Sequence, residues 1–235
     1  GGSSGTKKRS KLKVVLDMDE CLVHSIFAED GNKGHADGQL LQADGKGGMG
    51  GLHGGGVDAD GVERCRSFRL KMMDDEECTV NLRPGVEDFL ADVCSRFETW
   101  VFTAGMELYA SPLLDTIDPN NLLAGRLYRG NCRMHKGYFL KDLRVLAPSG
   151  DMSNIVLVDN NPVSFLCQPR NGIPVPSWYD SPHDRALYDV LEVLDEIEHV
   201  EDVRPVLDGK FQLKELLQAE RARILDVVDP DEPGL

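Results

Sequence analysis

The sequence has no cysteine pattern that would build a metal site or a reactive thiol. Its six cysteines are scattered over 235 residues, without a C-x-x-C pair or the histidine spacing of a zinc site. No cysteine is followed six positions later by arginine, which excludes the C-x5-R loop of cysteine-dependent phosphatases. Scattered cysteines are typical of a reducing compartment, so we expect an intracellular protein.

Positive charge is also scarce, and long apolar runs are missing. A formal net charge of −14 argues against direct nucleic-acid binding, which requires clustered Lys and Arg. No apolar run approaches the ~20 residues of a membrane span, so we expect no membrane segment. Residues 1–10 open with GGSSG, typical of a cloning remnant, and continue with a basic lead. The stretch KKRSKLK is either a nuclear address or simply solvated, so nuclear and cytoplasmic locations both stay open. Nothing in the sequence indicates an oligomeric state.

A glycine-rich segment, residues 28–66, interrupts the otherwise globular composition. It has little apolar content and no strict G-X-Y period, which excludes both a packed element and a collagen helix. We therefore expect a flexible insertion or long loop within one domain.

Strand and helix patterns alternate along the rest of the chain. β-Branched runs at 12–19, 98–105 and 154–161 predict strands buried on both faces, and 67–82 predicts a hairpin with an acidic turn around Asp74 to Glu76. Short strands and a turn are expected within 125–143. Helices are predicted at 83–97, opened by Pro84; at 106–118, broken by Pro112; at 181–200, with Ser181 as N-cap and Pro182 following; and at 210–225. This order favours an α/β fold, a parallel sheet flanked by helices with an inserted β-hairpin.

Polar side chains follow each of the three buried strands. They are Asp17 and Asp19, then Thr103, then Asp159 with Asn160. A single D-x-D is weak, because Asp after a strand commonly just starts a turn. Parallel strands, however, place such ends together, where ligands bind in open α/β sheets. Clustered carboxylate and amide oxygens suit Mg²⁺, which takes one or two carboxylates plus phosphate and water.

A phosphate ligand also needs local positive charge in this acidic chain. Between the second and third strands the chain supplies Arg129, Arg133, Lys136 and Lys141. A surface lysine paired with a neighbouring acid is the alternative for Lys141, and its position between the polar strand ends favours the functional interpretation.

Four ordered motifs together resemble a known family. VVLDMDECLVHS, WVFTAGMELYASPLLDTID, GRLYRGNCRMHKGYFLKDLRVL and IVLVDNNPVSFLCQPRNGIPVPSWYD are similar to the haloacid-dehalogenase-like phosphatases of the FCP/SCP type, which act on the C-terminal tail of RNA polymerase II and related phosphoproteins. The likeness runs over 11–207, interrupted by the insertion, and leaves 208–235 as an amphipathic helix and tail. It implies a haloacid-dehalogenase-like, Rossmann-like fold.

The resemblance also implies roles for individual residues. Asp17 would be the nucleophile of an aspartyl-phosphate mechanism, and Asp19 the general acid that protonates the leaving serine or threonine oxygen. An Asp nucleophile divides hydrolysis into two steps, after which Asp19 acts as base toward water. Thr103 and Lys141 would hold the phosphoryl oxygens, and Arg129 would reach toward the phosphoprotein substrate.

The same resemblance implies a magnesium site. Asp17, the backbone carbonyl of Asp19, and Asn160 would bind Mg²⁺, with Asp159 beside them. Cys21 departs from the family pattern, which has Thr or Val there; a buried structural thiol is favoured over an oxidation-sensitive one. Four residues are candidates for lining a peptide groove, and each is at least as compatible with the core: Phe68, Leu70, Met106 and Tyr109. Trp178 is expected to be structural.

Two other functions stay open. A small-metabolite phosphohydrolase would use the same chemistry, but such enzymes commonly close the site with a helical cap, which a glycine-rich segment followed by a hairpin cannot form. A non-catalytic scaffold that kept the fold is the third hypothesis. It is disfavoured because both aspartates, Thr103, Lys141 and Asn160 are all present.

Overall fold

A five-stranded parallel sheet forms the centre of the molecule. The structure, a computed structural model, describes residues 11–27, 56–57, 63–72 and 77–226. The strands lie in the order β12, β11, β1, β7, β8, and every neighbouring pair is parallel. Their bounds are Lys13–Leu16 (β1), Glu98–Phe102 (β7), Gly125–Leu127 (β8), Ile155–Asp159 (β11) and Gly172–Pro174 (β12). The expected α/β fold with a parallel sheet is therefore confirmed.

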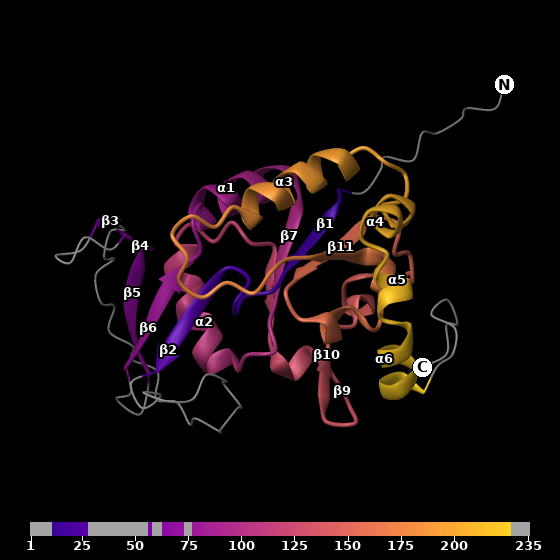
Figure 1. Cartoon of the computed structure of the whole chain (residues 1–235), viewed down its shortest axis with the longest axis horizontal. Helices are drawn as coiled ribbons and strands as arrows, with labels where there is room; N and C mark the ends of the chain where they lie inside the picture. The colour runs from indigo at the N-terminus through magenta and orange to yellow at the C-terminus, as the bar shows by residue number, and fades with distance from the viewer. Residues whose placement is uncertain (1–10, 28–55, 58–62, 73–76, 227–235) are drawn as a thin grey trace.

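Both faces of this sheet are covered, as runs buried on both sides require. On β1, Val14 and Leu16 belong to the same apolar cluster as residues of α1 (Val86–Arg96) and α3 (Ala186–Ile197). Figure 1 shows these two helices side by side over one face. Val15 points the other way, into a cluster that includes residues of α5 (Leu213–Leu216) and α6 (Gln218–Leu225). In the described part of the chain, short 3-10 helices lie at Arg129–Asn131, Leu143–Leu146, Pro162–Phe165 and Pro169–Asn171.

A second, antiparallel sheet is inserted after β1. Its strands are β2 (Val23–Phe27), β6 (Glu77–Leu82) and β5 (Ser67–Lys71). It stands apart from the central sheet, beside α2 (Glu107–Ile117), as Figure 1 shows. The predicted hairpin is β5 paired with β6, although its acidic turn lies outside the described residues. Within the glycine-rich segment, β3 (Gly56–Val57) pairs with β4 (Glu63–Arg64). Residues 28–55 and 58–62 of that segment lie outside the described residues, so the expected flexibility stays a prediction.

Proline positions misled two helix predictions. α1 begins at Val86 rather than at Pro84, because Gly85 adopts a left-handed conformation, φ 79°, just before the helix. The expected break at Pro112 is wrong: α2 runs from Glu107 to Ile117 with Pro112 inside it. Proline removes the donor that would bond the carbonyl of Leu108, but Leu108 is exposed, so water can replace that donor.

The start of α3 is also wrong in the sequence prediction. The helix begins at Ala186, and Ser181 does not cap it. The carbonyl of Ser181 instead accepts a hydrogen bond from the indole Nε1 of Trp178, 2.8 Å away, which gives the buried Trp178 its structural role. Asp184 accepts the backbone N–H of Ala186 at 3.0 Å and so supplies the local cap.

The C-terminal region forms three helices rather than one. They are α4 (Arg204–Phe211), α5 (Leu213–Leu216) and α6 (Gln218–Leu225). The predicted continuous helix over 210–225 is wrong because Gln212 adopts a left-handed conformation, φ 52°, which ends α4. α4 continues across residues 207 and 208, where we placed the end of the phosphatase domain; the domain bounds stay a prediction. Among the described residues, no helix combines the length and apolarity needed to cross a membrane.

Candidate active site

Polar residues gather at the carboxyl edge of the central sheet. β1 pairs with β11 with Leu16 opposite Val158, and the backbone N–H of Asp17 donates to the carbonyl of Val158 at 2.9 Å. Asp17 and Asp159 therefore leave adjacent strands at the same level. β7 lies on the other side of β1, and Thr103 follows its last residue. The structure thus brings together the ends of the three strands singled out in the sequence.

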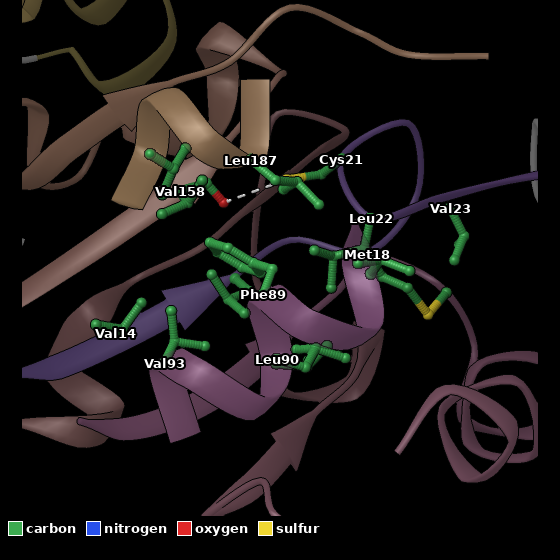
Figure 2. Close-up of a cluster of buried hydrophobic side chains, with 14 of the residues drawn as sticks. Val14, Met18, Cys21, Leu22, Val23, Phe89, Leu90, Val93, Val158 and Leu187 are labelled. Carbon is green, nitrogen blue, oxygen red and sulfur yellow. Dashed lines mark hydrogen bonds between the residues drawn. The ribbon is translucent and has the colours of Figure 1, made fainter. Parts of the chain in front are cut away.

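A tight turn after β1 holds Asp19. The carbonyl of Met18 accepts the backbone N–H groups of Leu22 and Val23, and Glu20 adopts a left-handed conformation, φ 55°. Met18 and Leu22 are fully buried, and Figure 2 shows them next to α1, near Phe89 and Leu90. The turn therefore places the side chains of Met18 and Leu22 in the core, while the side chain of Asp19 lies at the polar edge of the sheet.

Cys21 belongs to the core beneath this turn. Its side chain is buried, and the thiol lies 4.0 Å from the carbonyl of Val158, as the dashed line in Figure 2 marks. Burial raises the pKa of the Cys21 thiol well above its ordinary value, and the charges of Asp17 and Asp159 raise it further. The structure therefore places a neutral packing residue where the family pattern has Thr or Val.

Lys141 bridges the two carboxylates at the strand ends. It follows β10 (Tyr138–Leu140), which pairs with β9 (Arg133–His135) across a turn at Lys136 and Gly137, both with positive φ. Its ammonium group donates to Oδ1 of Asp17 and, at 2.6 Å, to Oδ2 of Asp159. All three side chains are less than 10% exposed. One cation thus compensates two buried carboxylates.

The pKa shifts follow from this imbalance. Burial raises the pKa of Asp17 well above its ordinary value, and the charge of Asp159 raises it further, although Lys141 opposes both. Burial alone would lower the pKa of Lys141, but the charges of Asp159 and Asp17 outweigh burial and raise it. Lys141 is therefore held in its charged form, while negative charge remains in excess.

Asp19 has different neighbours. Its Oδ2 accepts a hydrogen bond from the hydroxyl of Thr103 at 3.2 Å, and its Oδ1 accepts one from the hydroxyl of Tyr109 at 2.6 Å. Thr103 is itself held by the backbone N–H of Gly105, 2.8 Å from its oxygen. Burial raises the pKa of Asp19, and the hydrogen bond from Tyr109 only partly opposes that shift. Asp19 thus keeps its proton to a higher pH than an ordinary aspartate does.

The pocket suits a divalent cation. The excess negative charge of the site is buried, and the atoms available as metal ligands are oxygens, which Mg²⁺ prefers. Asp159 is already engaged, since Oδ1 accepts the backbone N–H of Asn161 at 2.7 Å. Asn160 donates to Ser177 at 2.9 Å through its Nδ2, which orients its amide. Among the described residues, no group of three or more His, Cys, Asp or Glu side chains is arranged to hold a metal ion, and Mg²⁺ in proteins usually takes only one or two carboxylates together with water and phosphate.

The other basic residues are dispersed. Arg129 lies near the loop after β7: its Nε donates to the carbonyl of Ala104 at 2.6 Å, and its guanidinium stacks 5.0 Å from the ring centre of Phe139. Lys136 instead pairs with Asp226 at 2.6 Å. Arg133 lies on β9. Of these three, Arg129 alone contacts the loop that carries Thr103.

Two of the suggested groove residues belong to the core. Phe68 and Leu70 are 1% and 4% exposed, because the inserted sheet buries one face of β5. Met106 is half-buried and precedes α2. The sequence predicts that Tyr109 lines the groove or lies in the core, and it does not predict the hydrogen bond from the Tyr109 hydroxyl to Asp19. No local pattern announces that contact, because it joins residues 90 positions apart.

Arg83 is a second residue that the sequence analysis missed. Its side chain has no exposed surface, yet it makes a bidentate pair with Asp184, at 2.7 and 3.0 Å. It also donates to the carbonyls of Cys21, at 2.9 Å, and Pro176, at 3.1 Å. Arg83 thereby ties the turn that carries Asp19 to the loop before α3.

We expect Arg83→Met to lower the free energy of unfolding by about 3–5 kcal/mol, because it leaves a partly buried carboxylate and two carbonyls without their donor. Urea denaturation measures the loss. Arg96→Met is the matched control: Arg96 is 25% exposed and pairs with Asp92, Asp195 and Glu198 at the surface, so about 1 kcal/mol or less is expected. Equal losses for the two variants would contradict the role assigned to Arg83.

The chain is similar in sequence to known phosphatases. Residues 12–204 match the family model described as NLI interacting factor-like phosphatase. A probable C-terminal domain small phosphatase of Dictyostelium discoideum is 46% identical over 195 residues, covering 83% of this chain and 53% of the relative. CTD nuclear envelope phosphatase 1 of Xenopus tropicalis is 37% identical over 202 residues, covering 84% of this chain and 72% of the relative.

A human relative is described as carboxy-terminal domain RNA polymerase II polypeptide A small phosphatase 1. It is 34% identical over 197 residues, which cover 84% of this chain and 63% of the relative. The chain thus spans only about half of the Dictyostelium relative and less than two thirds of the human one. The family resemblance noted in the sequence is confirmed, and the chain belongs to the NLI interacting factor-like phosphatase family.

Proposed function

We propose that this chain is a Mg²⁺-dependent protein phosphatase that hydrolyses phosphoserine or phosphothreonine through an aspartyl-phosphate. One observation carries the proposal: two aspartates two residues apart sit in unlike surroundings. Asp17 contacts the ammonium of Lys141, whereas Asp19 contacts the hydroxyls of Thr103 and Tyr109. Unlike surroundings for a pair of carboxyl groups are what separate a nucleophile from a proton donor.

The two steps follow from these contacts. A carboxylate oxygen of Asp17 forms a bond to phosphorus while the bond from phosphorus to the serine oxygen breaks, and Asp19 gives its proton to that oxygen. Asp19, now ionised, then takes a proton from water, whose oxygen attacks phosphorus and releases phosphate and Asp17. The raised pKa of Asp19 is compatible with the acid role, while Asp17, whose pKa is also raised by burial, has to be ionised to attack, and the adjacent charge of Lys141 favours that ionised form.

The remaining residues bind and orient the phosphoryl group. Lys141 is positioned to balance charge that develops on the phosphoryl oxygens, and Thr103 to donate a hydrogen bond beside it. Asp17, Asn160 and the backbone carbonyl of Asp19 would hold Mg²⁺, and Asp159 accepts a hydrogen bond from the ammonium group of Lys141 and so orients it. When bound, Mg²⁺ would supply charge neutralisation on the transferring group.

A macromolecular substrate fits the elements around the site. Between β1 and α1, the described residues form strands and contribute no helical cap of the kind that encloses small metabolites. Arg129 lies at the loop that carries Thr103 and offers a cation toward a phosphopeptide. The name of the human relative refers to the carboxy-terminal domain of an RNA polymerase II polypeptide, and we propose a tail-like phosphopeptide of that kind as substrate, in the nucleus or cytoplasm.

A phosphopeptide panel tests this function directly. With Mg²⁺ present, phosphoserine and phosphothreonine peptides should be hydrolysed faster than sugar phosphates, and EDTA should reduce turnover by at least about 10²-fold. Restoring Mg²⁺ should restore the rate. Preference for sugar phosphates would favour the small-metabolite enzyme, and no turnover of any phosphate ester would favour the scaffold.

A further inference from the structure

Both carboxylate oxygens of Asp19 are held by hydroxyl groups from different elements. Thr103, after β7, donates to Oδ2, and Tyr109, in the first turn of α2, donates to Oδ1. The Tyr109 oxygen also lies 2.6 Å from the hydroxyl of Ser25 on β2. A phenol has one proton, so while Tyr109 donates to Asp19 it accepts from Ser25.

This chain of contacts links the inserted sheet to the catalytic edge of the central sheet. The ring of Tyr109 packs against Phe27, also on β2, with ring centres 5.9 Å apart. Ser25 and Phe27 thus hold the oxygen and the ring of Tyr109 from one strand. Tyr109 is half-buried. Its burial and, to a smaller extent, the charge of Asp19 raise the pKa of its phenol well above the ordinary value, so the hydroxyl stays protonated and can donate a hydrogen bond.

We propose that Tyr109 is a positioning residue for the reaction: its hydroxyl, supported by Ser25, fixes the carboxyl group of Asp19 where it can protonate the departing oxygen. This inference rests on the proposed function. Proton transfer requires the acid within hydrogen-bond reach of the leaving oxygen, and a carboxyl group free to rotate spends less time in that geometry. Tyr109 thus acts through Asp19 rather than on the phosphoryl group.

The chemistry of the leaving group provides the test. 4-Nitrophenolate departs without a proton, whereas phenolate is more basic and gains more from one. The two substrates, 4-nitrophenyl phosphate and phenyl phosphate, are similar in shape. The ratio kcat/KM reports the steps up to the first irreversible step, which is the transfer of the phosphoryl group to Asp17. For Tyr109→Phe, which keeps the ring beside Phe27, we expect kcat/KM to fall about tenfold with phenyl phosphate and less than about threefold with 4-nitrophenyl phosphate. A phosphoserine peptide should lose at least as much as phenyl phosphate.

Two further variants make the outcome decisive. Tyr188→Phe removes the same atom from a tyrosine on α3, 43% exposed, and should leave both rates unchanged. Ser25→Ala keeps the Tyr109 hydroxyl, so we expect a smaller loss with the same dependence on the leaving group; if Tyr109→Phe unfolds, this comparison decides. Equal losses on the two esters, or none, would overturn the inference and leave the proposed function intact. Failure of the unmodified protein to hydrolyse either ester counts against the proposed function itself.

Discussion

Asp17→Asn is expected to abolish turnover while making the metal-free protein more stable. The amide cannot form the phosphoryl-enzyme, so kcat on a phosphoserine peptide should fall by at least about 10⁴-fold. Stability should move the other way, because one buried cation, Lys141, compensates the two buried carboxylates of Asp17 and Asp159. Removing one negative charge leaves a balanced pair, and we expect a gain on the order of 1 kcal/mol in EDTA.

The pH dependence of that gain has a definite sign. Because the pKa of Asp17 is raised in the folded protein, ionised Asp17 destabilises the fold, and the penalty is complete only above its folded-state pKa. Below the unfolded-state pKa both states are protonated and the penalty disappears. Asp17→Asn should therefore be more stable than the unmodified protein near pH 7 and equal to it in acid, as urea denaturation in EDTA would show. An inactive variant that is also less stable at pH 7 would contradict this account of the site.

The central sheet could be predicted because local pattern and tertiary environment agree there. The β-branched runs that become β1, β7 and β11 have neither the length nor the periodicity of amphipathic helices, and their polar ends mark one edge of a parallel sheet. Once the strands are parallel, Asp17, Thr103 and Asp159 have to lie at that edge. The approximate place of the site follows from secondary structure alone.

Contacts between distant segments could not be predicted in this way. Ser181 and Pro182 form a good local helix start, but the residue that caps the helix is Asp184, whose carboxylate is also held by Arg83 from 101 positions away in the sequence. The same holds for Arg83, which lies between the predicted hairpin and the predicted helix start at Pro84, and whose local sequence gives no sign of its buried ion pair with Asp184. Sequence periodicity reports which face of an element is apolar, and it does not report which polar atoms meet across the fold.

Lys141→Met should produce the largest combined loss of stability and activity. The variant leaves Asp17 and Asp159, both nearly inaccessible, without their shared cation. Breaking a buried ion pair by removing one partner typically costs about 3–5 kcal/mol, and we expect a loss in that range in EDTA at pH 7. Loss of the ammonium beside the phosphoryl group should also reduce kcat by about 10²–10³-fold.

Two comparisons separate this explanation from simple loss of packing. Lys136→Met also removes a lysine paired with aspartate, but Lys136 is 45% exposed, so about 1 kcal/mol or less should be lost. Combining Lys141→Met with Asp17→Asn removes one of the two stranded carboxylates, and the double variant should regain more than half of the lost stability while staying inactive. Additive losses in the double variant would mean that Lys141 stabilises the fold through its hydrocarbon chain. Recovery would mean that the carboxylates needed for catalysis are the charges that make Lys141 indispensable to folding.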